Sequence, residues 1–396
     1  MSSIRSRTRR FKEQEWLIDL AIGTAGPEWD QARVAYITNP LGMNMAFERK
    51  VLNDKLKNLD EYVPLFLRLA KLREKHAHEE EEKGHHRTAG DSYLAAALLY
   101  GGAAWPIWED GNETLLEIES KMEELYDKFG EHANHSVERV RIPFRGTYLS
   151  GLLHLPQSYD GSKRLGCLVS IPGMDSFKET LVCAHGDKML SRNFAVLAVD
   201  GPGQGESLAR KIKVEQRSFD EAGQAMFDFA SKHKSIDGKK IAIQGVSMGS
   251  YWALRAAAGS KGFSACSSFA SCYEPGMVTI FNKASPTFKE RFMWMTGIEE
   301  EERFDEFAAS MDLNQVLGNI GVPTLLTVGS NDHLSPLRYA YDVYDKIHAP
   351  KTLDIYIGEK HRVNHPFAED RRADWIIDRV SGKQFDSSVN ELPQLN

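Results

Sequence analysis

Charged and apolar residues are interleaved with helical spacing along the first third of the chain. Over residues 45–78 the apolar positions recur every three or four residues, which predicts amphipathic helices. Pro64 falls inside this stretch and is expected to divide it into two helices. Two further helices are predicted over residues 88–99 and 112–129. Because no strand-like alternation interrupts these segments, residues 1–134 are predicted to form a helical N-terminal region.

Near residue 135 the pattern changes to strands that alternate with helices. Residues 137–142 and 148–155 have the alternation of a β-hairpin, with the turn at Arg145-Gly146. Short apolar runs follow, most of them succeeded by a helical stretch, at residues 168–171, 194–199, 240–244, 265–269, 324–328 and 352–357. Such runs suit strands buried on both faces, so we predict an α/β fold with a mostly parallel central sheet flanked by helices. This domain is expected to span residues 135–385, followed by a tail over residues 386–396.

One connection between predicted strands is much longer than the others. Residues 273–320 contain helical stretches at 288–294 and 299–311. An insertion of this kind usually lies over the carboxyl ends of parallel strands, where ligands bind, so we predict a helical lid. Aromatic residues at helical spacing are commonly core residues, but here they also suggest an apolar or aromatic ligand. They are Tyr273, Phe281, Phe288, Phe292, Trp294 and those of residues 100–108.

Composition and charge are those of an ordinary globular protein. The chain has 396 residues, 42% hydrophobic and 27% charged, with a formal net charge of −7, which gives no reason to expect nucleic acid or an anionic membrane as a partner. No stretch approaches the length of about 20 apolar residues that a bilayer-spanning helix needs. Residues 1–16 lack the apolar core of a secretory signal and are expected to be a frayed, solvated terminus.

The cysteines are few for the length of the chain and indicate a reducing compartment. The four are Cys167, Cys183, Cys266 and Cys272. Three of them stand in apolar surroundings, which favours buried free thiols over a disulfide framework. The predicted location is therefore the cytoplasm.

The strongest chemical signal is the pentapeptide Gly245-Val246-Ser247-Met248-Gly249. It follows a predicted strand and opens a predicted helix over residues 250–258, which is the context of a nucleophile elbow. A nucleophile on so tight a turn needs small residues two positions before and two positions after it. The turn would expose the hydroxyl of Ser247 and direct the amide of Met248 toward a developing oxyanion.

A serine nucleophile needs a base and an acid that orients the base, in the chain order Ser, Asp or Glu, His. Asp332 follows the predicted strand 324–328, and His361 follows the predicted strand 352–357, so both are expected at the same edge of the sheet as Ser247. His333 and His365 are alternative candidates for the base. The first adjoins the acid in sequence and is expected to point elsewhere.

The second oxyanion donor is expected in the loop after the third strand, Ile171-Pro172-Gly173-Met174-Asp175-Ser176. Gly173 permits close backbone approach, and the amides of Met174 or Asp175 are the predicted donors. The carboxylate of Asp175 would repel an oxyanion if it were ionised and unpaired. It could hold a substrate hydroxyl or ketone, carry a proton with a raised pKa, or merely cap a helix beginning at Lys178.

Two other motifs invite functional interpretations that we consider weaker. The run over residues 76–86 contains four histidines beside glutamates, but nothing in it fixes a ligand geometry, and we interpret it as a solvated helix end and loop. Residues 200–206, Asp-Gly-Pro-Gly-Gln-Gly-Glu, lack the spacing of a dinucleotide site and the Lys-Ser/Thr pair of a phosphate loop. We interpret them as a structural turn near the active site.

Together, the segment 171–179, the segment 200–206, the Ser247 elbow and the contexts of Asp332 and His361 resemble a branch of the α/β-hydrolases. This branch includes 2,6-dihydroxypseudooxynicotine hydrolases and FrsA-like esterases, with fungal polyketide-shortening hydrolases as more distant relatives. The resemblance covers roughly residues 85–380. It implies an α/β-hydrolase fold whose helical N-terminal region covers the active site and helps to form a homodimer.

The resemblance also implies that an acidic residue at the position of Asp175 takes part in cleaving a carbon–carbon bond of a 1,3-diketone. The chain departs from the pattern in carrying Asp rather than Glu there, and in having Lys360 before the base, where Asp or Gly is commoner. The substrate identity therefore does not carry over.

The predicted function is that of a serine hydrolase acting through an acyl-enzyme on Ser247. The substrate is expected to be a small aromatic or polyketide-like molecule, cleaved at a β-diketone or an ester. Two alternatives remain open: a ligand-binding receptor that keeps the fold without turnover, and a lyase, cyclase or acyltransferase. No metal or organic cofactor is implied.

Overall fold

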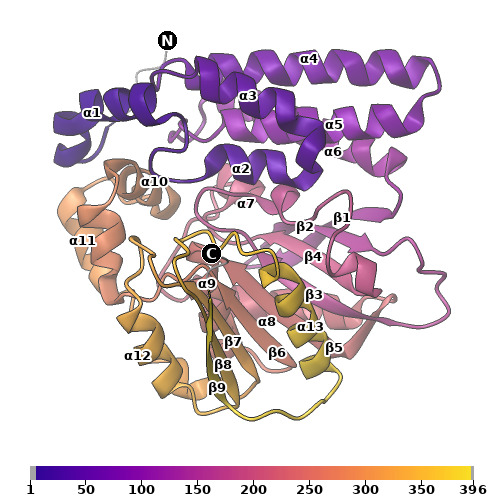
Figure 1. Cartoon of the computed structure of the whole chain (residues 1–396), viewed down its shortest axis with the longest axis vertical. Coiled ribbons are helices and arrows are strands. Elements are labelled where there is room, and N and C mark those ends of the chain that lie inside the picture. The colour runs from indigo at the N-terminus through magenta and orange to yellow at the C-terminus, as the bar shows by residue number, and fades with distance from the viewer. Residues whose placement is uncertain (1–5, 394–396) are drawn as a thin grey trace.

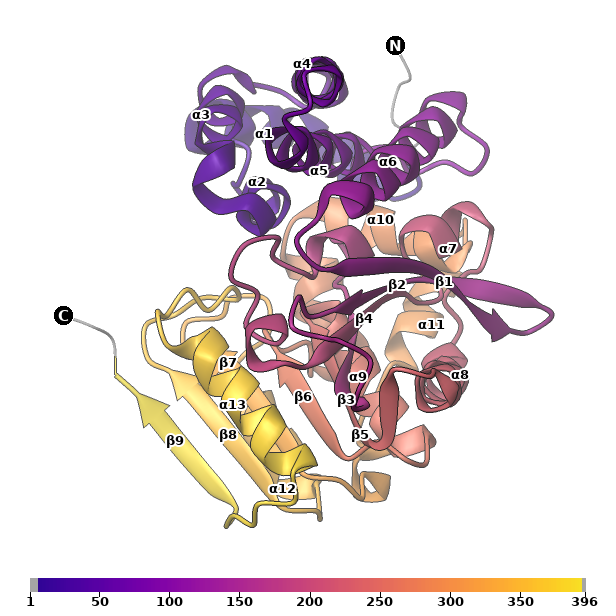
Figure 2. The same ribbon diagram turned by 90° about the vertical axis from the view of Figure 1, so that its right-hand side faces the viewer.

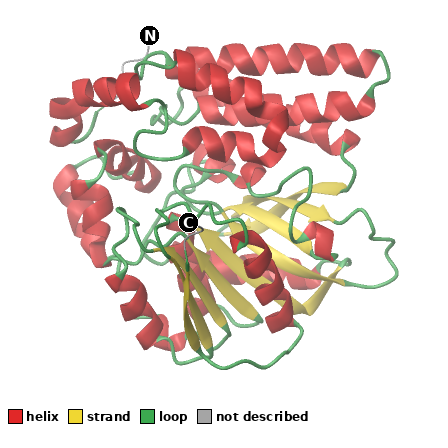
Figure 3. Ribbon diagram, in the orientation of Figure 1, coloured by secondary structure: helices red, strands yellow, loops and turns green. Residues whose placement is uncertain are grey.

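A computed structural model describes residues 6–393 and shows a helical layer on top of a twisted sheet with helices on both faces (Figure 1, Figure 3). The helical layer comprises α1 (Arg9–Ala25), α2 (Arg33–Thr38), α3 (Ala46–Lys55), α4 (Tyr62–Glu82), α5 (His86–Ala103) and α6 (Glu113–His132). The strands are β1 (Ser136–Phe144), β2 (Thr147–Leu155), β3 (Leu165–Ile171), β4 (Ala195–Asp200), β5 (Ile236–Val246), β6 (Ala265–Phe269), β7 (Thr324–Gly329), β8 (Lys351–Tyr356) and β9 (Ser388–Leu392). The remaining helices are α7 (Gly205–Ala209), α8 (Ser218–Lys232), α9 (Met248–Gly259), α10 (Pro286–Thr296), α11 (Glu301–Ala309), α12 (Arg338–Lys346) and α13 (Ala368–Val380).

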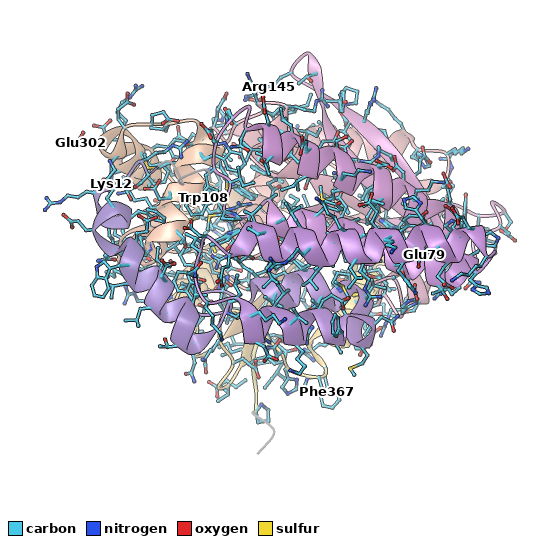
Figure 4. All side chains as sticks on the ribbon, turned by 90° about the horizontal axis from the view of Figure 1, so that it is seen from above. Lys12, Glu79, Trp108, Arg145, Glu302 and Phe367 are labelled. Carbon is cyan, nitrogen blue, oxygen red and sulfur yellow. The ribbon has the colours of Figure 1, made fainter. Side chains whose placement is uncertain are left out.

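The four helices predicted in the N-terminal layer correspond to α3, α4, α5 and α6, which begin and end within a few residues of the predicted positions. The stretch 45–78 is divided into α3 and α4, and Pro64 lies in the first turn of α4, where a missing N–H costs nothing. Asn112 caps α6 by accepting a hydrogen bond from Leu115 N. α5 packs against both α4 and α6, and α4 lies above it (Figure 2). Seen from above, Glu79 lies toward one end of the layer and Lys12 of α1 at the other (Figure 4).

The sheet has the order β1-β2-β4-β3-β5-β6-β7-β8-β9 among the described residues. β1, β2 and β4 pair antiparallel, and the strands from β4 onward pair parallel, as predicted for most of the sheet. The hairpin turn at Arg145 and Gly146 has positive φ at both residues, 45° and 76°, which matches the twist of the two strands.

Both faces of the parallel strands are buried, which explains their continuous apolar runs. Along β4, Leu197 belongs to the large core shared with α8, α9 and α12, whereas Val196 belongs to a smaller core packed against α13. Figure 2 shows α13 on one face of the sheet with α12, α9 and α8 behind it. The carboxyl ends of the parallel strands point toward the helical layer.

Two predictions about the chain ends are wrong where the structure describes them. Residues 9–25 form α1, and Arg7 N donates to Glu290 Oε2 at 2.9 Å, so this segment is docked on α10 and is not frayed. At the other end, β9 extends the sheet by pairing with β8, so residues 388–392 of the predicted tail form an edge strand. The first five residues of the predicted terminus and residues 394–396 of the predicted tail lie outside the described residues.

The insertion between β6 and β7 forms α10 and α11, close to the predicted helical stretches. It lies beside the N-terminal helices, at the end of the molecule where Lys12 and Glu302 are labelled in Figure 4. Within the described chain, no helix is both long enough and apolar enough to cross a bilayer.

Candidate active site

The backbone at Ser247 is held in a strained turn between β5 and α9. Its φ of 57° and ψ of −123° lie in a region that non-glycine residues rarely adopt. The flanking glycines are required by close backbone contacts. A Cβ on Gly245 would stand 1.8 Å from Gly249 O, and a Cβ on Gly249 would stand 2.6 Å from Ile171 O and from Pro172 O. Glycine is therefore sterically required at both flanking positions, as in a nucleophile elbow.

Ser247, His361 and Asp332 form one hydrogen-bonded chain. Ser247 Oγ lies 2.8 Å from His361 Nε2, and His361 Nδ1 lies 2.8 Å from Asp332 Oδ2. The other carboxylate oxygen, Asp332 Oδ1, accepts hydrogen bonds from the amides of Leu334 and Ser335 at 2.8 and 3.1 Å. The side chains of Asp332 and His361 are 1% and 4% exposed, so the imidazole is fixed in orientation and shielded from water.

The strand ends that carry the acid and the base are bound to each other. A Cβ on Gly329 would stand 2.3 Å from Lys360 O, and Asn331 N donates to Glu359 O at 2.8 Å. This close approach of the loops after β7 and β8 sets the spacing between Asp332 and His361.

The alternative bases do not contact Ser247. His333 is exposed, as expected of a side chain pointing away from the acid. His365 packs against the rings of Tyr356 and Phe367, with centroid distances of 4.9 and 5.5 Å. It also lines a cavity above Ser247, but it makes no hydrogen bond with Ser247.

The loop 172–176 lies directly against the elbow. A Cβ on Gly173 would stand 3.0 Å from Val246 O and 3.1 Å from Ser247 Cβ. Gly173 N donates to Ser176 Oγ at 2.9 Å, whereas the amides of Met174 and Asp175 make no hydrogen bond with another described residue. An amide without a partner beside the nucleophile is the feature an oxyanion donor needs, as is the amide of Met248 at the first turn of α9.

Residues 200–206 support this loop from behind, consistent with the structural turn expected there. Gln204 Nε2 donates to Pro172 O at 2.6 Å and to Gly173 O at 3.2 Å. Gln204 Oε1 accepts from Gly201 N at 2.9 Å, which fixes the amide orientation. The turn was predictable from its residues, but this contact was not, because the two loops are about thirty residues apart in the chain.

Behind the same loops lies a buried cluster of one lysine and three carboxylates. Lys178 Nζ lies 2.8 Å from Glu179, 3.0 Å from Asp200 and 3.2 Å from Glu206, and the lysine is fully buried. Burial alone would lower the pKa of Lys178, but the carboxylates outweigh burial and raise it. The lysine therefore stays charged and holds the loops after β3 and β4 together.

The carboxylate of Asp175, in the loop 172–176, is not unpaired. Its Oδ2 lies 3.2 Å from Arg33 Nη2, and its Oδ1 lies 3.2 Å from Arg291 Nε. Trp105 Nε1 donates to Oδ1 at 3.0 Å. Because two guanidinium groups balance the carboxylate, the repulsion expected of an unpaired anion is removed.

The capping interpretation of Asp175 is wrong. The segment after it, Lys178–Thr180, is a single 3₁₀ turn whose first residue is preceded by Phe177, and no side chain caps it. Instead, Asp175 joins three parts of the chain: α2 through Arg33, the end of α5 through Trp105, and α10 through Arg291. These three partners were not predicted, since Arg33 and Arg291 stand in helices, Trp105 follows one, and none lies in a motif that indicates the contact.

A cavity of about 410 Å³ opens above Ser247. Its wall combines apolar side chains with polar ones from the helical layer and from the loop after His361. The lining residues include Tyr36, Pro40, Met174, Leu181, Phe269 and Arg362. The N-terminal region therefore covers the nucleophile, and a small organic molecule fits above it.

The insertion contributes less to this cavity than predicted. Tyr273, Phe281, Phe288, Phe292 and Trp294 are all buried in the core, and none lines the cavity above Ser247. Phe281 and Phe292 pack against each other at a centroid distance of 5.1 Å and against Phe304. These aromatic residues bind the insertion to the core, so they carry no argument for an aromatic ligand. Trp294 lines a separate small cavity on the far side of Asp175.

The four cysteines are free, and one lies beside the nucleophile. Burial raises the pKa of the Cys272 thiol, which keeps it protonated next to Ser247. Cys272 is therefore no rival nucleophile at neutral pH.

The histidine-rich run is partly packed against α5. His76 Nδ1 lies 2.9 Å from Ser92 Oγ, and His78 Nδ1 lies 2.9 Å from Tyr93 Oη. Glu81 of this run also meets Glu131 and His132 of α6, a grouping with metal-ligand atom types. Lys128 Nζ already lies 3.5 Å from Glu81 and 3.1 Å from Glu131, so the grouping forms a surface ion-pair network.

Comparisons with known proteins agree with this architecture. The sequence model of the prolyl oligopeptidase family matches residues 184–378. The alpha/beta hydrolase ucsC of Acremonium sp is 29% identical over 267 residues, a match that covers 63% of this chain and 53% of that protein. The 2,6-dihydropseudooxynicotine hydrolase of Paenarthrobacter nicotinovorans is 25% identical over 334 residues, covering 83% of this chain and 87% of that protein.

Solved structures show the same fold over nearly the whole chain. The crystal structure of the 2,6-dihydroxy-pseudo-oxynicotine hydrolase superposes with a TM-score of 0.73 and 21% sequence identity, covering 90% of this chain and 98% of that one. The match includes the helical layer as well as the sheet, because the sheet domain alone is too short to account for that coverage. The chain therefore has the α/β-hydrolase fold, with its strand–elbow–helix at Ser247, and it is similar to hydrolases over most of its length.

Proposed function

We propose that this protein hydrolyses a carbon–carbon bond of a β-diketone, or an ester bond, in a small aromatic or polyketide-like molecule, with Ser247, His361 and Asp332 as its catalytic residues. The observation that carries the proposal is the unbroken hydrogen-bonded chain from Ser247 Oγ through His361 to Asp332, at 2.8 Å for each step, beneath a cavity of about 410 Å³. A binding protein has no need to keep a strained serine aligned on a buried imidazole.

The reaction begins with attack of Ser247 Oγ on a substrate carbonyl while His361 Nε2 takes the hydroxyl proton. The negative charge that develops on the carbonyl oxygen is stabilised by the amide of Met248 and by an amide of Met174 or Asp175. Asp332 orients His361 and stabilises its positive charge. The tetrahedral intermediate then expels an alkoxide or an enolate, which receives the proton from His361, and leaves an acyl group on Ser247.

Water completes the cycle by the same path. His361 takes a proton from a water molecule, the hydroxide attacks the acyl carbon, and the proton passes back to Ser247 Oγ as the carboxylic acid leaves. For a β-diketone the sum is one diketone and one water converted to one carboxylic acid and one ketone. Each cleavage therefore incorporates one oxygen atom from solvent.

Asp175 contributes to this reaction by positioning the oxyanion loop. Its carboxylate is held by Arg33, Arg291 and Trp105, and its backbone belongs to the loop that lies against Ser247. We therefore assign Asp175 an auxiliary role: it holds the loop in place, and its ion-paired carboxylate forms part of the wall of the substrate cavity. The relative named 2,6-dihydropseudooxynicotine hydrolase supports the choice of a small-molecule substrate over a peptide.

The direct test is labelling with a fluorophosphonate probe, followed by assays with p-nitrophenyl esters and aryl 1,3-diketones. The parent protein is expected to be labelled on Ser247 and to turn over one of the two substrate types. Ser247→Ala should abolish both, whereas Ser381→Ala, which removes an exposed serine, should change neither. Folded parent protein that is not labelled would favour a receptor.

Product analysis in water enriched with oxygen-18 separates hydrolysis from the other chemistries. The carboxylic acid product is expected to carry solvent oxygen in every turnover. An acyltransferase, lyase or cyclase would form its product without that label.

We also infer that the protein works as a homodimer in the cytoplasm. Support for the dimer comes from α1, where Trp16, Leu17 and Leu20 leave a cluster of apolar side chains 64%, 40% and 55% exposed. Support for the compartment comes from the four free thiols, three of them buried. Light scattering measures the molar mass of both proteins in solution. The parent protein is expected to be a dimer and Trp16→Glu a monomer.

A further inference from the structure

The charged side chains on the cavity wall differ in whether they have an oppositely charged partner. Among the described residues, four ionised side chains line the cavity above Ser247: Asp175, Arg362, Glu369 and Arg372. Asp175 is balanced by two arginines, and Arg372 forms an ion pair with Glu369 while its guanidinium lies 4.6 Å from the ring centroid of Phe269.

Arg362, in contrast, has no carboxylate partner among the described residues. It follows the proposed base directly in sequence, and its guanidinium lies over the ring of Tyr36, 5.8 Å from the centroid. No carboxylate of the described chain lies within ion-pair distance of it, and it makes no hydrogen bond there. A cation on the wall of a partly enclosed cavity, without a counter-charge, attracts an anion more strongly than it would in open water.

The neighbouring amides add to the same preference. Gln31 uses its Oε1 to accept from Tyr36 Oη at 2.6 Å, and Asn39 uses its Oδ1 to accept from Arg49 Nη2 at 2.8 Å. Both residues line the cavity, and the NH₂ group of each has no partner among the described residues, so it remains available as a donor. Gln244 is the exception, because its Nε2 donates to Ser170 Oγ and its Oε1 has no partner.

From this arrangement we propose that the substrate carries an acidic group, ionised at neutral pH, that pairs with Arg362 while the acyl carbon lies at Ser247. Carboxylates and the enolates of acidic 1,3-diketones have this chemistry, and a planar guanidinium can bind either through two N–H groups. The rest of the substrate is apolar, because Pro40, Leu181 and Phe269 line the same cavity. Arg362 is then the residue that determines specificity for charge. The position of the acyl carbon at Ser247 rests on the proposed function. The preference for a ligand with an acidic group does not.

The test compares two ligands of equal size, 4-phenylbutyrate and 4-phenylbutyramide, by calorimetric titration of the full-length protein. The parent protein is expected to bind the carboxylate at least tenfold more tightly than the amide. Arg362→Gln should remove this difference, and Arg362→Lys should restore part of it as a point charge. Lys360→Gln is the matched control. It removes the same charge from an exposed position two residues away in the same loop and should leave the preference intact.

Equal binding of the two ligands by the parent protein, binding of neither at millimolar concentration, or an unchanged preference in folded Arg362→Gln would each overturn the proposal. Labelling of Ser247 by the fluorophosphonate probe is measured alongside. A charge preference without labelling would contradict the proposed hydrolase function alone, whereas labelling without a charge preference would contradict the inference about Arg362 alone.

Discussion

At the scale of single residues, the geometry of the site depends on a glycine, whose missing Cβ lets two loops approach closely. Gly173 has no Cβ, and this allows the loop 172–176, which we propose to supply an oxyanion donor, to lie against Ser247. We expect Gly173→Ala to lower kcat by about a hundredfold, because the added methyl group would displace the loop by a few tenths of an ångström or tilt its amides. Gly321→Ala is the control, since a Cβ there meets nothing within 4 Å. Steady-state kinetics with the better substrate measures the effect, and equal rates for the two variants would contradict the assignment of this loop.

Asp332 gives a second prediction at the same scale. Asp332→Asn keeps an oxygen for the amides of Leu334 and Ser335 but no longer stabilises a positively charged His361. We expect kcat to fall on the order of a thousandfold or more while KM changes little, as in other serine hydrolases with this substitution. Asp342→Asn, an exposed change on α12, serves as the control. A variant that lost affinity and kept kcat would show that Asp332 acts in binding.

The three proposed catalytic residues were predictable because each follows a buried strand. Apolar runs locate β5, β7 and β8, and the chain must leave each strand at the same edge of the sheet. Arg33, Trp105 and Arg291 were not predictable. Their common partner, Asp175, lies 70 or more residues away from each of the three, and nothing near them in sequence indicates that contact.

At the scale of elements, the helical layer and the insertion are joined to the sheet through buried ions. Arg33 is 3% exposed, and Asp175 is 6% exposed. We expect Asp175→Asn to reduce the free energy of unfolding by about 3 kcal/mol, because it leaves the buried guanidinium of Arg291 without a carboxylate partner and leaves Arg33 with Asp30 alone. Urea denaturation measures this loss. The activity should fall as well, since the oxyanion loop loses its anchor.

The control for this prediction is an ion pair with the same chemistry on the surface. Asp54 pairs with Lys50 on α3, where both side chains are more than half exposed. Asp54→Asn should change the stability by less than about 0.5 kcal/mol. If Asp175→Asn were as mild as Asp54→Asn, the buried contacts would not be what holds the helical layer in place.

Elements without strong periodicity were the ones that sequence analysis missed. β9 reads Ser-Val-Asn-Glu-Leu and is only partly buried, so it lacks the apolar run of the central strands. It forms because β8 offers an open edge. The segment before α1 is polar, yet Arg7 and Thr8 bind Glu290 of α10 through their amides. Burial of these elements depends on partners supplied by the folded molecule.

At the scale of the whole molecule, the junction between the helical layer and the sheet contains a buried pair of histidines. His135 Nε2 lies 2.9 Å from His154 Nδ1, and the residues are 7% and 0% exposed. Burial lowers the pKa of His135 to about 4, and it lowers that of His154 well below the usual value. Neither imidazole therefore carries a charge in the folded protein at neutral pH.

Because the folded pKa of His135 lies below its unfolded value of about 6.5, the unfolded chain binds the proton more readily as the pH falls. The contribution of neutral His135 to the free energy of unfolding is fully present above pH 6.5 and is lost between pH 6.5 and about 4. Between pH 7 and pH 5 the loss amounts to about 2 kcal/mol for His135. Glu119 has the opposite effect, since burial raises its pKa to about 8 and so favours folding at lower pH.

The contribution of the histidines is isolated by comparing variants at two pH values. The free energy of unfolding of the parent protein should fall more steeply from pH 7 to pH 5 than that of His135→Gln, because glutamine does not titrate and the effect of Glu119 cancels in the difference. His348→Gln, an exposed change, should follow the parent protein. Parallel pH dependences for the parent and His135→Gln would mean that water or local opening reaches this junction, and that the helical layer separates from the sheet before the histidines take up protons.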